Sequence, residues 1–493
     1  MKVILAGYNI DSAVIEELKA KLPGRADVTP ETLSAAYARI SRDPRSADEL
    51  RDAARAEVDR ARRSNKTIIF KMGHHSVAEH AVFNFDIIGV SRLAIEEIEK
   101  FRMGSYTEKS QRYIKLEDDF LLPKEIINAG KKQIFLDHIK LQNDLYHKLY
   151  HKLRPYFFDK YPEYAQDPKK HTVLDGWAKE DARYVVSLAT LGQLGLTMNA
   201  RSLEYLIRKF ASKELDELKK LNQKIYDLAK EVAPSVLLFT EANDFDSLTY
   251  DKLREKSNTL LKANERPSSE DVRLVDYTAN ADTKLTACLM HSTSFFPYSV
   301  CLDKAKKMSS QKRSEYLKTA FRHMEFYDAV LREFEYINLT FELVVSATCF
   351  AQLKRHRMAT LCSQEYDPSL GVVIPPSVSA VGMGDKFREC IDKTSDIYTA
   401  FKKSMNKGAE YILTNAHRKR VLLQVNAREL YHISRLREDP TAQWDIRTIT
   451  EKMCRLAKKK MPLSFMLLGS KDAYPQIYQR IFNKPPKLLP PKF

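Results

Sequence analysis

Two arginines flank a histidine at Arg355-His356-Arg357, in the second half of the chain. A guanidinium donates paired hydrogen bonds to a phosphate and keeps its charge at physiological pH. Two guanidiniums and an imidazole therefore suit a phosphate or another electron-rich, planar ligand. Basic residues are also common in the last turn of a helix, where they complement its dipole, and alone such a triplet is more often structural.

The first half carries a different polar set. It has Lys100-Phe101-Arg102 in place of the triplet, and Ser110-Gln111-Arg112 follows a few residues later. A small hydroxyl, an amide and an arginine in one loop form a cradle for an anion or a uracil ring. The second half has Glu365-Tyr366-Asp367 at the corresponding positions, and its carboxylates would repel a phosphate. Each half thus keeps what the other has lost.

A cluster of histidine and glutamate lies upstream, at Gly73-His74-His75-Ser76-Val77-Ala78-Glu79-His80. Clustered histidines suggest zinc, but neither the HExxH nor the HxxEH spacing is present. We therefore expect no metal here, and interpret the segment as a polar network or a loop that lines a cofactor.

The elements that must position these residues occur twice in the same order. Residues 83–87 and 339–343 alternate apolar and polar side chains, which predicts half-buried strands. Each leads into a short amphipathic segment that ends in the basic cluster. An apolar stretch interpreted as helical follows in each half, at 182–196 and at 409–423. Each stretch leads to an Asn-Ala-Arg motif that opens a further helix.

This repetition predicts an α+β fold of two tandem domains, each a small sheet with long helices. We place the first domain at residues 1–242 and the second at 270–493. The polar segment 243–269 is the expected connector.

Composition fits a globular chain, with 493 residues, 44% of them apolar, and a formal net charge of +16. The charge favours anionic partners, either nucleic acid or phosphorylated small molecules. Six cysteines without a CxxC pair indicate reduced thiols. No apolar run approaches the ~20 residues of a membrane span. The start, residues 1–7, predicts a strand rather than a signal peptide, so we expect a cytoplasmic protein with no membrane partner.

The ordered strings GHHSVAEH, GVSR, SYTEKSQRY, TMNARSL and VNAREL resemble the flavin-dependent thymidylate synthases. Their signature is Arg-His-Arg followed, after seven residues, by Ser, and neither half of this chain carries all of it. The resemblance implies FAD as cofactor, NADPH as reductant and methylenetetrahydrofolate as one-carbon donor, converting dUMP into dTMP without a cysteine nucleophile. It makes nucleic acid an unlikely partner.

The resemblance assigns one nucleotide site to two sets of residues. One set is Gln352, Arg355 and Arg437, with Arg437 polarising the uracil ring. The other set is Glu108, Ser110, Gln111, Arg112 and Arg183. The opposite pairing joins Glu97, Lys100 and Phe210 with Glu365, Asp367 and Glu410, and it has lost its key cations. One composite site is therefore expected to survive while its twin is inactive.

The flavin contacts implied by the resemblance come from both halves. They are Ser76, His74, Glu108, Arg355, His356, Arg357, Asn426, Arg428 and His432. Asn199 and Arg201 match the motif too, and a role in the fold alone is the alternative for them. Because the family assembles four such domains, a tandem chain is expected to form a homodimer.

Two alternatives stay open on the sequence. One is a related flavin- and nucleotide-binding protein with a different pyrimidine or without turnover. The other is a basic nucleic-acid-binding protein built on the same scaffold.

Overall fold

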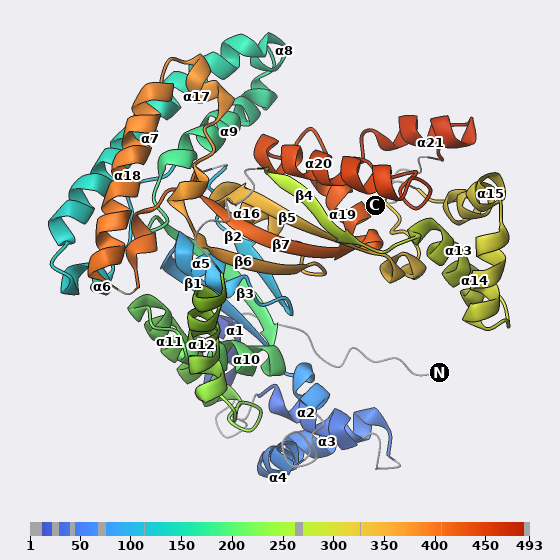
Figure 1. Ribbon diagram of the computed structural model, residues 1–493. Coiled ribbons are helices and arrows are strands. Elements are labelled where there is room, and N and C mark those ends of the chain that lie inside the picture. The colour runs from blue at the N-terminus through green and yellow to red at the C-terminus, as the bar shows by residue number, and fades with distance from the viewer. Residues whose placement is uncertain are drawn as a thin grey trace. The chain divides into compact units, whose positions relative to one another are not determined.

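The computed structural model describes residues 12–21, 29–39, 45–67, 75–112, 114–261, 270–325, 327–405 and 407–487 (Figure 1). The chain divides into two compact units. The first comprises Met1–Asp144, Val186–Arg266 and Lys393–Leu413, and the second comprises Leu145–Val185, Pro267–Asp392 and Thr414–Phe493. Each unit therefore contains one segment from the opposite half of the sequence. The strand predicted for residues 1–7 lies outside the described residues.

The first unit contains a three-stranded antiparallel sheet. Its strands are β1 (Val82–Ser91), β3 (Leu191–Asn199) and β2 (Gly104–Glu108), in the order β1-β3-β2. The predicted strand at 83–87 is confirmed within β1. The central strand β3 buries Leu194, Leu196 and Met198, which alternate with more exposed residues.

The second unit contains a four-stranded sheet, which is antiparallel throughout. Its strands are β4 (Val272–Tyr277), β5 (Asn338–Ser346), β7 (Arg418–Asn426) and β6 (Thr360–Tyr366), in the order β4-β5-β7-β6. The predicted strand at 339–343 is confirmed within β5. The edge strand β6 pairs with β7 and carries a register shift between Ser363 and Tyr366.

The helical interpretation of residues 182–196 and 409–423 was wrong for most of both stretches. Each begins with a short 3-10 helix, η4 (Arg183–Val185) or η7 (Ala409–Ile412), and then becomes the strand β3 or β7. In β7 the buried residues Val421, Leu423 and Val425 recur every second position, which is the period of a strand. Apolar content alone does not separate this pattern from a helix.

Helices complete the first unit. They are α1 (Ser12–Lys21), α2 (Glu31–Arg39), α3 (Ala47–Ala56), α4 (Val58–Asn65), η2 (His75–His80), α5 (Arg92–Ile98), α6 (Lys124–Asn128), α10 (Ala200–Ala211), α11 (Asp216–Val232) and α12 (Asp244–Leu260). The long helices α7 (Lys132–Lys160) and α18 (Gly384–Ser404) contribute residues to both units. Helix α10 packs against the core through Leu203, Leu206, Ile207 and Phe210, whose spacing puts them on one face of the helix.

The second unit is also rich in helices. They are α8 (Pro162–Ala165), η3 (Pro168–Lys170), α9 (His171–Ala182), α13 (Ala281–Ser292), α14 (Tyr298–Lys307), α15 (Ser310–Phe321), η5 (Arg332–Tyr336), α16 (Ala347–Leu353), η6 (Pro368–Leu370), α17 (Pro376–Ala380), α19 (Ala427–Arg437), α20 (Trp444–Lys460) and α21 (Tyr474–Phe482). None of the described helices in either unit is long and apolar enough to cross a membrane.

Matching capping bonds relate the two units in detail. Asn199 ends β3 and accepts the backbone N–H of Ser202 at 2.9 Å, and Asn426 ends β7 and accepts that of Glu429 at 2.8 Å. An asparagine oxygen at this position satisfies an N–H that the first helical turn leaves without a partner. The motif asparagines therefore start α10 and α19, whatever else they bind.

The arginines of the two Asn-Ala-Arg motifs also make equivalent ion pairs. Arg201 reaches Glu79 of η2 at 2.6 Å, and Arg428 reaches Glu335 of η5 at 2.7 Å. Arg428 donates a further hydrogen bond to the carbonyl of Val330 at 2.9 Å. Because both units keep this ion pair, we infer that its primary role is to hold the 3-10 turn against the helix that carries the arginine.

A buried tyrosine fixes each exchanged segment in its unit. In the second unit Tyr184 donates to Asp445 at 3.0 Å, and Ser346 donates to the same carboxylate oxygen at 2.5 Å. In the first unit Tyr411 donates to Glu217 at 2.8 Å. Hydrogen bonds to a buried carboxylate contribute roughly 1.5–3 kcal/mol each, so these contacts anchor the exchange.

Ser91 completes the first-unit triad and caps α5. Its hydroxyl donates to Glu217 at 2.6 Å and accepts the backbone N–H of Ala94 at 3.0 Å. Ser346 caps α16 in the same way, accepting from Cys349 at 2.9 Å. Both units thus contain the same arrangement of a tyrosine, a carboxylate and a capping serine.

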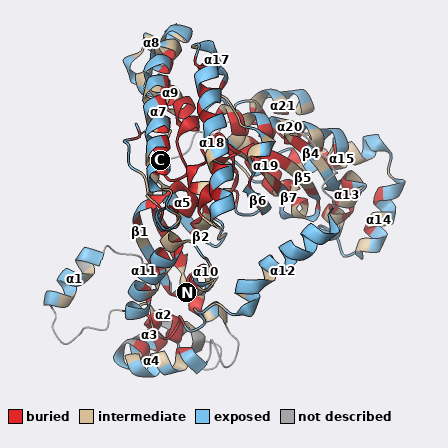
Figure 2. Cartoon of the chain, turned by 60° about the vertical axis from the view of Figure 1, so that its left-hand side comes forward, coloured by how far each residue is buried: buried red, intermediate tan, exposed pale blue. Residues whose placement is uncertain are grey.

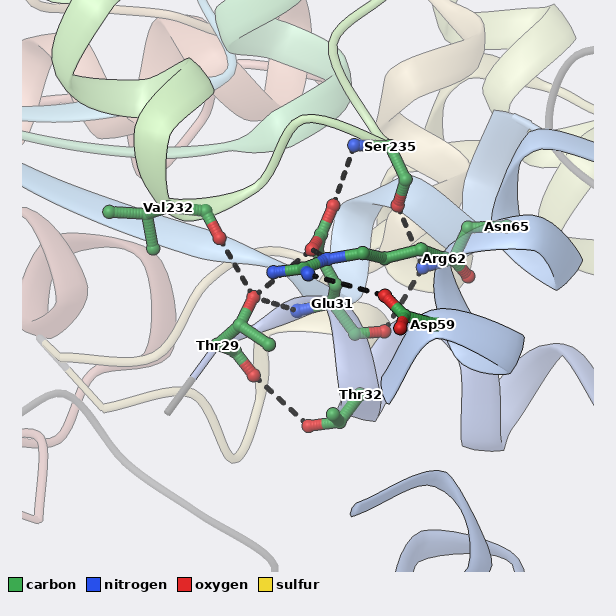
Figure 3. Close-up of polar contacts among 8 residues, drawn as sticks. All are labelled: Thr29, Glu31, Thr32, Asp59, Arg62, Asn65, Val232 and Ser235. Atoms are coloured by element: carbon green, nitrogen blue, oxygen red, sulfur yellow. Dashed lines mark hydrogen bonds and ion pairs between the residues drawn. The ribbon is translucent and has the colours of Figure 1, made fainter. Parts of the chain in front are cut away.

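The N-terminal helices of the first unit are held by the buried carboxylate of Glu31 on α2 (Figure 3). Its oxygens accept from Arg62 of α4 at 2.9 Å and from the backbone N–H of Ser235 at 2.6 Å. Asn65 donates to both the Glu31 carbonyl, at 3.1 Å, and the Ser235 hydroxyl, at 3.3 Å. The same helix α2 presents Tyr37 edge-on to His80 of η2 at 4.6 Å, which positions the turn that carries Ser76.

The predicted connector contains a helix, α12, which Figure 2 shows exposed along its length. Its start is fixed by Asp246, which accepts from Arg208 at 2.7 Å and from Lys209 at 2.6 Å. Burial would raise the pKa of Asp246, but these bonds outweigh it and hold that pKa at about 2.

Candidate functional site

The basic triplet of the second unit follows directly after α16. His356 is buried, Arg355 is half-buried and Arg357 is exposed. Arg437, the last residue of α19, donates from Nε to Nε2 of His356 at 2.9 Å and from Nη2 to the carbonyl of Gln352 at 3.3 Å. The structure therefore brings together three of the predicted residues, Gln352, His356 and Arg437.

Arg437 is followed directly by two acidic residues, Glu438 and Asp439, with which a surface arginine could form an ion pair. Glu438 instead accepts from the hydroxyl of Ser434. Asp439 lies 3.4 Å from Lys471 and accepts the backbone N–H of Thr441 at 3.0 Å. The contacts of Arg437 with His356 and Gln352 thus point toward the triplet.

The surroundings of His356 favour its neutral form. Burial lowers its pKa, and the positive charge of Arg437 and the proximity of His432 lower it further, while the Glu429 carboxylate works in the opposite direction. Glu429 Oε1 lies 3.5 Å from His356 Nδ1. Because Nε2 accepts from Arg437, the ring proton of the neutral imidazole belongs on Nδ1.

Gln352 offers an acceptor to a ligand. Its Nε2 donates to Gln443 at 3.3 Å, while its buried Oε1 accepts no hydrogen bond within the described part of the chain. Gln443 in turn donates to Tyr184 at 2.7 Å, so the side chain is held by a buried network. Buried acceptors are normally satisfied, so this oxygen is available to a hydrogen-bond donor of a bound ligand.

Arg183 belongs to this unit and not to the one that carries the serine loop. It lies buried in η4, and its carbonyl accepts from Asn415 at 3.0 Å. The family resemblance had grouped it with Glu108, Ser110, Gln111 and Arg112. The exchange of segments places it in the unit of Gln352, Arg355 and Arg437.

The remaining flavin candidates of the second unit differ in how they are engaged. His432 is exposed and lies edge-on to His356 with ring centroids 5.8 Å apart. Asn426 and Arg428 make the capping bond and the ion pair described above. An exposed arginine and an exposed histidine beside a half-buried arginine fit the anionic groups of a dinucleotide, so the donor set is compatible with FAD.

The serine loop of the first unit borders a small pocket. The pocket is lined by Arg92, Ile95, Glu108, Lys109, Ser110, Gln111, Ile114, Leu116, Thr190, Leu191 and Gly192. Ser110 accepts the backbone N–H of Arg112 at 3.1 Å, which shapes the turn. Three predicted residues, Glu108, Ser110 and Gln111, thus meet in one cavity.

Arg92 also lines this pocket, although it is not among the predicted site residues. This arginine is buried at the start of α5, and its Nη1 lies 3.9 Å from Oε1 of Glu108. The second unit has Ala347 after the equivalent capping serine. The string GVSR contained the signal, since an arginine directly after a capping serine on an apolar helix is an unusual buried cation.

Ser76, one of the flavin candidates, is exposed in the turn η2. The neighbouring candidate in the sequence, His74, lies outside the described residues. Among the described residues, no group of three or more His, Cys, Asp or Glu side chains is arranged to hold a metal ion.

At the positions of the basic cluster, the first unit has an apolar side chain and a lysine whose charge is neutralised by a nearby glutamate. Phe101 packs edge-on against Phe210 at 5.8 Å and against Tyr205 at 5.7 Å. Glu97, at the position of Gln352, pairs with Lys100 and, at 2.8 Å, with Lys213. Burial alone would raise the pKa of Glu97, but the two lysines hold it at about 2.

Two carboxylates of the opposite set, Glu365 and Asp367, lie at the end of β6. Glu365 and Asp367 are exposed, and Asp367 accepts the backbone N–H of Ser369 at 2.9 Å. Glu410 lies in η7 of the first unit. These acidic groups carry no feature that would favour an anion.

Known proteins show similarity over most of the chain. UPF0159 proteins of Chlamydia pneumoniae and Thermoplasma acidophilum are 25% and 24% identical to it; these alignments cover 83% and 80% of this chain and 80% and 86% of the relatives. A flavin-dependent thymidylate synthase of Geobacter sulfurreducens is 30% identical over 212 residues, which is 42% of this chain and 80% of that relative. A solved UMP/dUMP methylase, PolB of Streptomyces cacaoi, covers 40% of this chain and 95% of its own with 16% identity and a TM-score of 0.32.

One family model matches the chain twice. The model described as thymidylate synthase complementing protein matches residues 26–235 and again residues 273–463. The two matches agree with the repeated order of strand, capped helix and Asn-Ala-Arg motif in the two units. The chain therefore belongs to this family, that of the flavin-dependent thymidylate synthases, and contains two copies of its domain.

Proposed function

We propose that the chain is a flavin-dependent thymidylate synthase that converts dUMP into dTMP, with methylenetetrahydrofolate as one-carbon donor and NADPH as reductant through FAD. The observation that carries the proposal is the pair of Arg437 and His356, with the open acceptor of Gln352 beside it. These groups are present in one unit only: the first unit has Phe210 and Phe101 at the positions of Arg437 and His356, and the ion-paired Glu97 at the position of Gln352. A purely structural cluster would have no reason to differ so completely between two copies.

The chain's own residues would act by binding and polarising the pyrimidine. The guanidinium of Arg437 is held by His356 and by the Gln352 carbonyl, so little reorganisation is needed when negative charge develops on the ring. A fixed donor of this kind typically contributes ~100-fold or more to a reaction rate. Gln352 would accept an N–H of the base, and Arg355 and Arg183 would hold the anionic part of the nucleotide.

The first-unit pocket would serve the nucleotide through a second set of donors. Ser110 and Gln111 provide a hydroxyl and an amide, and Arg112 provides a guanidinium. Arg92 adds a buried cation, which Glu108 partly neutralises. We propose that this set and the second-unit set serve the same nucleotide, as the family resemblance implies.

The flavin would be held mainly by the second unit. Arg355, Arg357 and His432 provide the exposed and half-exposed cationic and imidazole groups, and Ser76 of the first unit provides a hydroxyl. When bound, FAD would supply the hydride chemistry that no side chain of this set can supply. Arg428 and Asn426 would act through the fold, because their side chains already hold α19 and η5.

The test is direct. The purified chain is incubated with FAD, NADPH, methylenetetrahydrofolate and dUMP, and dTMP is measured by chromatography. The proposal expects dTMP, and expects that omission of the folate or of NADPH abolishes it. Flavin binding without any dTMP under these conditions would contradict the proposal.

A second candidate is a family member that binds flavin and nucleotide but uses another pyrimidine or has no turnover. It is favoured by one observation: neither half of the chain carries the complete signature of Arg-His-Arg followed, after seven residues, by Ser. Substituting UMP or dCMP for dUMP in the same assay separates this candidate from the first.

A further inference from the structure

Three neighbouring side chains of the second unit have changed together in the first. Glu429, His356 and Arg437 correspond to Ser202, Phe101 and Phe210, counted from the capping asparagines and from the capping serines. The geometry is nevertheless kept. His356 meets His432 edge-on at 5.8 Å and 73°, and Phe101 meets Tyr205 at 5.7 Å and 74°.

The features that both units keep are structural. They include the asparagine caps, the arginine–glutamate pairs and the tyrosine–carboxylate–serine triads. A residue needed only for folding would be expected among these retained features. Glu429 is not among them: it disappears from the unit in which the histidine and the arginine have disappeared.

The contacts determine which atoms donate and which accept hydrogen bonds among the three residues. Arg437 Nε can only donate, so His356 Nε2 must accept, over 2.9 Å. The ring proton then lies on Nδ1, which faces Glu429 Oε1 at 3.5 Å. Nδ1 is buried and has no hydrogen-bond partner among the residues that the structure describes, so the Glu429 carboxylate at 3.5 Å is the acceptor group placed beside it.

We propose that Glu429 is a positioning residue that keeps the proton of His356 on Nδ1, so that Nε2 stays an acceptor and orients the guanidinium of Arg437. This inference rests on the proposed function, since it assigns the orientation to the residue that would polarise the substrate. Glu429 lies within the family motif but had no assigned role. In this proposal it acts on His356 and does not contact the substrate.

Protonation or a change of tautomer would break the arrangement. Either event puts an N–H on Nε2, opposite the N–H of Arg437, and two donors cannot bond to each other. The charged and titratable groups that face His356 are Glu429, Arg437 and His432. Of these groups Glu429 is the one whose acceptor oxygen lies beside Nδ1, so it favours the Nδ1–H tautomer from that side of the ring, as the Arg437 bond to Nε2 does from the other.

The first experiment uses the apo chain and does not depend on activity. Histidines are labelled with nitrogen-15, the His356 signal is assigned with His356→Gln, and tautomer and pKa are followed by NMR. We expect an Nδ1–H tautomer, a lower His356 pKa in Glu429→Gln, and a higher one in Arg437→Met. An Nε2–H tautomer in the wild type, or an unchanged pKa in Glu429→Gln, would overturn the inference.

The second experiment measures dTMP formation. Partners that orient a functional histidine in metal sites typically contribute 10–100-fold, and we expect about a tenfold loss of kcat in Glu429→Leu, with a smaller change in KM for dUMP. Glu429→Gln keeps an acceptor for Nδ1–H and should recover most of the rate. Ser202→Ala, at the matching position of the first unit, should behave as the wild type.

The two experiments separate the inference from the function. If the wild type forms no dTMP, the proposed function fails while the NMR result still decides the role of Glu429. If dTMP forms and Glu429→Leu keeps the wild-type kcat, the positioning role is wrong and the proposed function stands.

Discussion

Phe210 occupies in the first unit the position that Arg437 occupies in the second, since each lies eleven residues after the asparagine that caps its helix. Each side chain reaches the middle residue of the cluster behind the preceding helix, Phe101 or His356. One unit thus uses the position for apolar packing and the other for a polar pair. The fold tolerates either, so the arginine is not required for folding.

The first prediction follows for Arg437→Ala. The variant should fold, retain FAD and continue to oxidise NADPH, while dTMP formation falls ~100-fold or more because a fixed donor is lost. Flavin absorbance, NADPH consumption and dTMP are measured in the same samples. Arg447→Ala, whose side chain bonds only to the carbonyl of Pro440 in the contacts described, serves as a control. dTMP formation within a few-fold of wild type would show that Arg437 is not the polarising residue.

The second prediction concerns Phe210 itself. Phe210 is fully buried, and Phe210→Ala should lower the free energy of unfolding by ~3–5 kcal/mol, through lost burial and a cavity. Urea unfolding followed by fluorescence measures the change. Tyr205→Ala is the matched control, since Tyr205 lies on the same helix and is 54% exposed, and it should cost much less. Equal losses in the two variants would contradict the role of Phe210 in the core.

Residue patterns predicted the duplication and the strands β1 and β5, because alternation of apolar side chains is a local signal. The same signal was overlooked in β3 and β7, where Gly192, Gly195 and a basic start at Arg418 obscured it. These are the central strands of both sheets, so their helical interpretation misplaced the apolar face that each sheet buries.

The exchange of segments had no local signal. It is fixed by Tyr184 meeting Asp445 and by Tyr411 meeting Glu217, contacts that join residues 261 and 194 positions apart. A single sequence shows that tyrosine, aspartate and glutamate are present, but not which of them pair. For this reason the grouping of Arg183 with the serine loop could not be tested before the structure. The loop residues were predicted from their types and spacing, and their role in binding stays a prediction, although Glu108, Ser110 and Gln111 do line one pocket.

The third prediction concerns pH. Asp181 is buried and accepts from Ser377 at 2.5 Å and from Trp444 at 2.8 Å, yet burial dominates and raises its pKa to about 7. A raised pKa in the folded state contributes stability at low pH, which is lost as pH rises through about 7. Compared with Asp181→Asn, the wild type should therefore lose ~2–4 kcal/mol of unfolding free energy between pH 4 and pH 8.

The comparison with Asp181→Asn is needed because two buried histidines change the unfolding free energy with pH in the opposite direction. Burial lowers the pKa of His138 and that of His417 to about 4, so their contribution is lost as pH falls below the ordinary histidine range. The wild type and Asp181→Asn both contain these histidines, so the difference in unfolding free energy between the two proteins isolates the contribution of Asp181. A difference that does not change with pH would show that Asp181 is ionised in the folded chain throughout.

The fourth prediction concerns assembly. If four family domains build the working enzyme, two copies of this tandem chain suffice, and we expect a homodimer. Sedimentation velocity at several concentrations measures the mass, for which one chain contributes 56.9 kDa. A stable monomer with full activity would contradict the prediction.

The last prediction tests whether the two sets of residues serve one nucleotide. Arg112→Ala in the first unit and Arg355→Ala in the second each remove a cation proposed to hold dUMP. If both cations act on the same anion, the double variant should lose less in kcat/KM than the product of the two single losses, because a site that already lacks one anchor has less binding energy to lose. Glu365→Ala is the matched control. It alters the loop of the opposite set, and its turnover should stay near that of the wild type. Losses that multiply fully would indicate that Arg112 and Arg355 act independently, and the proposal of a shared nucleotide would then be wrong.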